Sequence, residues 1–143
     1  MLIICIFTQY VNSEIILLKF GTMALHNELG KKGEQAAAEF MKNKGCKILK
    51  RNWTMHRHEI DIVAEDEEFI IFVEVKTRTS RQWGNPEDFI GKTKIKRIVE
   101  AADLYLQLNN IDKPARFDII SAVWDGEVFD IEHIDDAFMS PVF

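Results

Sequence analysis

The spacing of hydrophobic residues predicts a helix and three strands in the first half of the chain. From residue 25 to 44 apolar positions recur at helical spacing, and Gly45 stands where a helix cap is expected. Shorter apolar or alternating runs at 46–53, 58–64 and 69–78 predict three strands, and the acidic run Glu65–Glu68 predicts a turn. The helical positions are Leu25, Leu29, Ala37, Phe40 and Met41.

The second half of the pattern predicts a helix and a hairpin. Asn85 and Pro86 are typical of a helix start, with Asn as the cap and Pro in the first position. Residues 117–124 predict a fourth strand, and Asp125-Gly126 predicts a type I′ turn into a fifth strand at 127–134. The predicted buried stripe of the helix is Ile95, Ile98, Val99, Ala102, Tyr105 and Leu106.

The order of these elements is helix, three strands, helix, two strands. A long crossover that contains a helix joins the third and fourth strands, which implies that these two strands run parallel. The strands joined by short turns are antiparallel. The pattern therefore predicts an α/β sandwich with a mixed five-stranded sheet.

Charged residues interrupt the second and third strands, where charges are normally excluded. Glu74 and Lys76 are two apart and share a face. A loop over residues 65–68 would leave Asp61 diagonal to Glu74, at roughly 7–8 Å, whereas a loop of only residues 67 and 68 would place them directly opposite, at about 4.5–5.5 Å. A three- or five-residue loop would separate them.

Two carboxylates on one half-buried face, with Glu59 as a third candidate, repel each other and need cations. Lys76 supplies one charge, and Asp61 and Glu74 are suited to bind Mg²⁺ or Mn²⁺ through hard oxygen ligands. Glu34 lies on the packed stripe of the first helix. Gly30 and Gly33 beside it would let that helix approach the sheet closely.

Each of these charges also has an ordinary structural interpretation. Glu34 could complement the positive end of the helix dipole, and Asp61 could be an edge-strand charge that prevents aggregation. Glu74 and Lys76 could be a cross-face ion pair. All four residues in one geometry favour a functional site.

The composition predicts one compact domain. The chain has 143 residues, of which 47% are hydrophobic. The two cysteines fit neither a disulfide framework nor a zinc motif, so a cytoplasmic location is expected. The net charge is −5, but two basic tracts, at 42–58 and 76–97, suggest either a localised polyanion-binding face or ordinary solvated surface.

The first 22 residues predict an extension outside that domain. Their opening apolar run is only seven residues long and polar residues follow it, so neither a membrane span nor a good signal peptide is predicted. Met23 resembles a natural start. Residues 1–22 are therefore expected to be a non-native or disordered extension of a single domain at 23–143, with an additional N-terminal strand as the alternative.

Six short motifs carry a family resemblance: GE at 33–34, RNW at 51–53, EIDIVA at 59–64, FVEVKTR at 72–78, KIKRI at 94–98 and RFDII at 116–120. They resemble the YraN family, small bacterial proteins predicted to be endonucleases and similar to archaeal Holliday-junction resolvases of the PD-(D/E)xK nuclease superfamily. The resemblance covers Leu25 to about Phe138. Ile60 replaces the proline of the superfamily, and His58 replaces a glycine usual in the family.

This resemblance implies a restriction-endonuclease-like three-layer sandwich in the order αβββαββ and a Mg²⁺- or Mn²⁺-dependent endonuclease acting on DNA, including branched or damaged DNA. Asp61 and Glu74 would be the metal ligands, Lys76 would position or activate water, and Glu34 would be an acidic catalytic partner. By analogy with resolvases, a homodimer is one state to test. The residues expected to contact nucleic acid are Arg78, Arg81, Lys92, Lys94, Lys96 and Arg97.

Three other functions compete with this interpretation. The first alternative is a nucleic-acid-binding protein that has the nuclease fold but no cleavage activity, although a binder would not need Asp61, Glu74 and Lys76. A nucleotide-dependent enzyme is suggested by Gly91-Lys92-Thr93, but Pro86 stands where a P-loop requires glycine. A protein-binding role would leave the buried charges unexplained.

Overall fold

The structure, a computed structural model, describes residues 2–80 and 90–139, with only the backbone described for residues 2–18 and 20. The chain divides into two units, Met1–Lys32 and Gly33–Phe143, and helix α1 (Leu2–Asn43) begins in the first and ends in the second. None of the described helices is long and apolar enough to cross a membrane. The division between residues 22 and 23 expected from the sequence stays a prediction.

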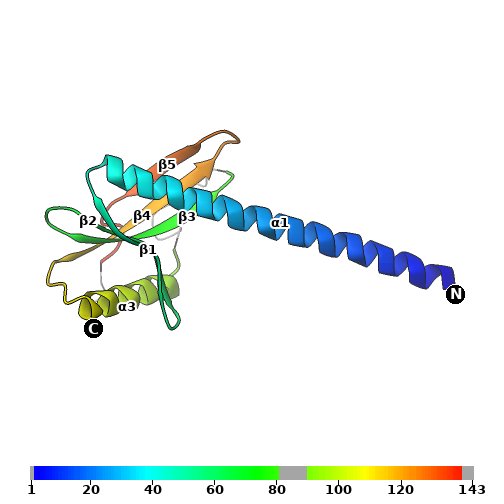
Figure 1. Ribbon diagram of the computed structural model, residues 1–143, viewed down its shortest axis with the longest axis horizontal. Helices are drawn as coiled ribbons and strands as arrows, with labels where there is room; N and C mark the ends of the chain where they lie inside the picture. The colour runs from blue at the N-terminus through cyan, green and yellow to red at the C-terminus, as the bar shows by residue number, and fades with distance from the viewer. Residues whose placement is uncertain (1, 81–89, 140–143) are drawn as a thin grey trace. The chain divides into compact units, whose positions relative to one another are not determined.

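The second unit is built on one mixed sheet with strand order β1-β2-β3-β4-β5 (Figure 1). Neighbouring strands in this sheet are antiparallel, except that β3 and β4 are parallel and are joined by the crossover that contains a helix. The α/β class and the order αβββαββ of a restriction-endonuclease-like fold are confirmed. The elements after α1 are β1 (Lys47–Met55), β2 (His58–Glu65), β3 (Ile70–Arg78), α3 (Lys92–Leu108), β4 (Ala115–Trp124) and β5 (Phe129–Ile134).

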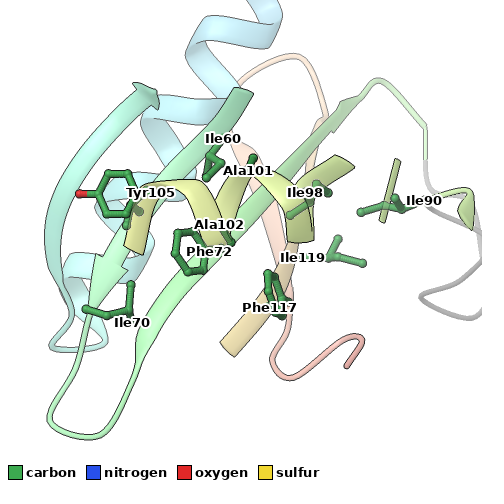
Figure 2. Close-up of a cluster of buried hydrophobic side chains, with 11 residues drawn as sticks. Ile60, Ile70, Phe72, Ile90, Ile98, Ala101, Ala102, Tyr105, Phe117 and Ile119 are labelled. Carbon is green, nitrogen blue, oxygen red and sulfur yellow. The ribbon is translucent and has the colours of Figure 1, made fainter. Parts of the chain in front are cut away.

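Apolar side chains fill both faces of this sheet and make it the middle of three layers. On one face Ala37, Ala38 and Met41 of α1 pack against β2 and β3. On the other face α3 points Ile98, Ala102 and Tyr105 at the strands (Figure 2). The strands alternate their side chains between these layers, so a polar residue of the interior strands lies toward one of the two helix layers.

A glycine brings α1 unusually close to β3. A Cβ built on Gly33 would overlap the hydroxyl oxygen of Thr77 and lie 2.9 Å from its Cγ2 and 3.0 Å from its Cβ. The close approach predicted for Gly33 is therefore confirmed. Gly30 does not share it, because no described atom lies within 4 Å of a Cβ placed there.

The helix ends differ in part from the sequence expectation. Gly45, with φ of 92°, caps α1 as predicted, and its N–H donates to the carbonyl of Lys42 at 2.9 Å. The start at residue 25 was wrong: α1 begins at Leu2 because no proline interrupts the preceding residues, and Leu25 is exposed rather than packed. The predicted start at residues 85 and 86 lies outside the described residues, and α3 begins at Lys92 after Gly91.

The turn between β4 and β5 is shifted by one residue from the prediction. Trp124 pairs with Phe129, and the Asp125 N–H donates to the Val128 carbonyl at 3.2 Å, so Gly126 and Glu127 form the turn instead of Asp125 and Gly126. The type I′ assignment was wrong, because it requires a positive φ at Asp125 and only Gly126 has one in this turn. The Asp125 carboxylate accepts the backbone N–H groups of Glu127 and Val128, both at 2.8 Å. The Asp125 side chain therefore satisfies the backbone of the turn from its first residue, which favours the shifted position over the predicted one.

We expect Gly33→Ala to destabilise the fold by about 1–3 kcal/mol, because the added methyl group overlaps a β-branched residue that has little room to rotate. Gly30→Ala in the same helix is the matched control, and it should be neutral or stabilising by up to about 1 kcal/mol because alanine favours helix. Urea denaturation of both variants measures the difference. Equal stabilities would contradict the close approach.

Candidate functional site

The β2–β3 register places Asp61 opposite Glu74. The printed pairs run from Glu65 with Ile70 to Ile62 with Val73, and the next residues outward are Asp61 and Glu74. This is the register expected for the short loop at residues 67 and 68. The alternative with a four-residue loop was wrong, because Asp66 still bonds to Phe69 at 3.1 Å and extends the antiparallel pairing toward the turn.

The Asp61 side chain takes over a backbone hydrogen bond of β3. Strand pairing ends at Ile62 and Val73, and the Val75 N–H instead donates to Asp61 Oδ2 at 2.8 Å. A β2 strand flanked by β1 and β3 is interior, so the interpretation of Asp61 as an edge-strand charge is wrong. The two strands part where the carboxylate enters between them.

A left-handed residue in β1 marks the same point. Ile62 packs on the α1 side of the sheet, whereas Ile60 and its β1 partner Trp53 pack on the α3 side. Residues two apart normally share a face, so the strands change faces here. Asn52, with φ of 47°, lies across from Asp61 between the two pairs and makes this change possible.

Glu74 is buried, with a side-chain exposure of 6%, and both of its oxygens are paired with lysines. Lys76 Nζ lies 2.9 Å from Oε1, and Lys94 Nζ lies 3.4 Å from Oε2. Lys94 also lies 3.4 Å from Oε1 of the exposed Glu59. The ion pair expected between Glu74 and Lys76 is confirmed, and α3 adds a second cation to it.

The site remains short of positive charge. Burial and the charges of Glu74 and Glu34 together raise the pKa of Asp61 from 3.8 to about 7, although the Val75 N–H and Lys94 act in the opposite direction. Burial alone would lower the pKa of Lys94, but the neighbouring carboxylates outweigh it and the pKa is raised. The arrangement therefore stabilises a cation placed beside Asp61.

Glu34 is near this pair but does not form a ligand cluster with it. It is half-buried and its charge acts on Asp61. The helix-dipole interpretation of Glu34 was wrong, because α1 begins at Leu2, far from this residue. Within residues 2–80 and 90–139, no three His, Cys, Asp or Glu side chains gather closely enough to hold one ion.

The donor set that remains, two carboxylates, fits a magnesium-type ion. Such an ion keeps several waters and uses one or two protein carboxylates together with substrate phosphates. Asp61 and Glu74 are the residues that could hold it. Glu59 does not join them, since its carboxylate is 66% exposed and is paired with Lys94.

The residues expected to contact nucleic acid separate into different environments. Lys92, Lys96 and Arg97 are exposed on the first turns of α3, and Arg78 is half-buried at the end of β3. Arg81 lies outside the described residues. The side chain of Lys94 points toward the carboxylate pair, and sequence reasoning missed this contact. The sequence signal that could have indicated it is that Lys94 lies four residues before the buried Ile98 on the same helix.

A second charged cluster, also missed by sequence reasoning, is buried below the end of α1. Asp118 is completely buried and accepts two hydrogen bonds of 2.9 Å from Arg116. His133 Nε2 lies 2.8 Å from the same carboxylate, and the Asp136 N–H donates to it at 3.1 Å. Burial raises the pKa of Asp118, but these hydrogen bonds outweigh burial and hold the pKa below its usual value. The cluster ties β4 to β5.

Comparison with known proteins gives a consistent family match. The family described as "Uncharacterised protein family UPF0102" matches residues 33–122, which include both charged strands and Lys94. UPF0102 proteins from Phocaeicola vulgatus and Bacteroides thetaiotaomicron are each 47% identical over 121 residues, or 85% of this chain and 100% of each relative. One from Flavobacterium psychrophilum is 47% identical over 116 residues, or 81% of this chain and 98% of that protein.

We expect the stability of metal-free protein to depend on Asp61 between about pH 4 and pH 8. As the pH rises, the unfolded chain releases this proton first while the folded state holds it, so ionisation progressively disfavours the fold. Asp61→Asn cannot titrate and should gain stability relative to the parent across this range. Urea denaturation in EDTA at several pH values tests this, with the exposed Asp112→Asn as the control; a parallel pH profile for parent and Asp61→Asn would contradict it.

We expect Asp118→Asn to cost about 3–5 kcal/mol of stability, because it removes the charge that two hydrogen bonds from a part-buried arginine require. Asp103→Asn, which alters a carboxylate that accepts one hydrogen bond from Gln107 on the surface of α3, should change stability by less than about 0.5 kcal/mol. Thermal or chemical unfolding measures both. A small effect at Asp118 would show that this cluster is not stabilising.

Proposed function

We propose that this chain, which belongs to the UPF0102 (YraN) family, is a metal-dependent endonuclease that hydrolyses phosphodiester bonds in DNA. The observation that carries the proposal is the placement of Asp61 opposite Glu74 in the sheet interior, with Lys76 bonded to Glu74. A buried carboxylate with a half-buried carboxylate and lysine beside it is costly to maintain, and a stable fold does not require this group. Its chemistry suits a hydrolytic site.

Asp61 and Glu74 would hold Mg²⁺ or Mn²⁺. The ion, when bound, would lower the pKa of a water molecule and offset charge on the scissile phosphate. Lys76 would orient the attacking water and stabilise negative charge on the phosphate oxygens, because Glu74 holds its ammonium group at the site. Glu34 is half-buried, and its negative charge acts on Asp61. It would add to the negative charge of the pair and so favour a bound cation.

Basic residues of α3, of the end of β3 and of the segment that follows it in sequence would hold the substrate. Lys92, Lys96 and Arg97 on α3, with Arg78 and Arg81 on the strand end and the segment after it, would contact phosphates flanking the reactive one. Phosphate contacts position a nucleic acid without reading its sequence. DNA structure, such as a branch or a damaged site, would then decide where cleavage falls, and a homodimer would cut two strands together.

The second candidate function is nucleic-acid binding without cleavage. Both oxygens of Glu74 are already paired with lysines, which is the observation that favours it. In that case Asp61, Glu74 and Lys76 would be a structural charge cluster. The chain would bind DNA equally well without a divalent metal.

A cleavage assay separates these functions. The parent should cut at least one of a four-way junction, a flap, a linear duplex and single-stranded DNA in the presence of Mg²⁺ or Mn²⁺. Asp61→Asn, Glu74→Gln and Lys76→Ala should each reduce the rate by at least about a hundredfold, the usual loss when one group that stabilises transition-state charge is removed. Glu65→Gln, which alters a carboxylate of β2 paired instead with Lys113, is the matched control and should cut as the parent does.

Measured affinity for Mg²⁺ or Mn²⁺ should distinguish the two carboxylate variants from the lysine variant. Asp61→Asn and Glu74→Gln should lose it, whereas Lys76→Ala should still bind metal. Cleavage that survives Asp61→Asn would rule out this site, and DNA binding by the parent without cleavage of any substrate would favour the second function.

A further inference from the structure

The two lysines on Glu74 are held unequally. Lys76 Nζ is 2.9 Å from Oε1, a tight ion pair between neighbours on one face of β3. Lys94 Nζ is 3.4 Å from Oε2 and also 3.4 Å from Glu59, so its ammonium group is shared between two carboxylates. Longer, shared contacts are weaker, which makes Lys94 the more easily displaced cation.

Lys94 also has an alternative position for its charge. Its side chain is 30% exposed and comes from the first turn of α3, where a flexible four-carbon stem can turn toward solvent. Glu59 is 66% exposed and already within 3.4 Å. Leaving Glu74 would therefore not leave the ammonium group unpaired.

A cation that enters between the strand carboxylates must compete for their oxygens. Asp61 Oδ2 accepts the Val75 N–H, and the two oxygens of Glu74 are each paired with a lysine. A divalent ion on Glu74 Oε2 would meet the positive charge of Lys94 at a few ångströms, where like charges repel strongly in a half-buried site. One lysine has to yield, and the geometry favours Lys94.

We propose that Lys94 is an exchangeable counter-ion of Glu74, which holds Oε2 in the metal-free protein and moves to Glu59 when a divalent cation binds Asp61 and Glu74. This inference rests on the proposed metal site and adds a regulation to it. The lysine neutralises the carboxylates while the site is empty of metal, and it lowers the affinity for metal by competing with it. Lys94 is thus a residue that tunes the site from a neighbouring helix.

Calorimetric titration of Mn²⁺ into the full chain tests the exchange without an activity readout. Lys94→Gln removes the charge and keeps a flexible polar side chain one atom shorter, so Mn²⁺ should bind at least about threefold more tightly than to the parent. Lys113→Gln is the matched control, because it removes one charge from a lysine of similar exposure that pairs with Glu65 and not with the site. Its affinity for Mn²⁺ should equal that of the parent.

Lys94→Arg keeps the positive charge and should bind Mn²⁺ no more tightly than the parent, which provides a second variant if Lys94→Gln fails to fold. Affinity that is unchanged or weaker in Lys94→Gln, or tighter in Lys94→Arg, would overturn the exchange and leave the proposed function standing. If neither the parent nor any variant binds Mn²⁺ or Mg²⁺, the proposed metal site is overturned, and the exchange with it.

Discussion

The placement of two carboxylates, Glu74 buried and Asp61 half-buried, between interior strands is the constraint on which this structure depends. Asp61 and Glu74 face each other where β2 and β3 stop pairing, and neither can be buried without compensation. The Val75 backbone N–H donates a hydrogen bond to Asp61, and lysines from β3 and α3 form ion pairs with the two oxygens of Glu74. Because these donors come from different layers, the sheet and α3 must be placed correctly at the same time.

The local irregularities of the chain are consistent with that constraint. Asn52 adopts a left-handed conformation beside Asp61, and the strands change faces there. Gly33 lets the end of α1 lie against Thr77 of β3, one residue before Glu34. Features of this kind cost stability and are often concentrated at functional sites. Asn52 lies across from Asp61, and Gly33 directly precedes Glu34, whose charge acts on Asp61. Their positions support a functional interpretation of the charges over a purely structural one.

The Asp118 cluster shows what a structural charge network looks like in the same protein. Its carboxylate is completely buried, yet arginine, histidine and a backbone N–H satisfy it and its pKa is held low. The pKa of Asp61 is shifted in the opposite direction, to about 7, because burial and the charges of Glu74 and Glu34 outweigh the Val75 N–H and Lys94. A fully compensated carboxylate stabilises the fold, whereas an under-compensated one is suited to bind a cation.

The sequence by itself determined the strands, the mixed sheet, the shared face of Glu74 and Lys76 and the close approach at Gly33, because periodicity and residue size act locally. It left two β2–β3 registers open, because a two-residue loop and a four-residue loop both bring Asp61 and Glu74 to the same face. Tertiary structure decided which register formed, where α1 begins, how the β4–β5 turn closes and that Lys94 reaches Glu74. It also assembled Asp118, Arg116 and His133 from two strands. These outcomes depend on contacts between residues far apart in sequence, which no local pattern records.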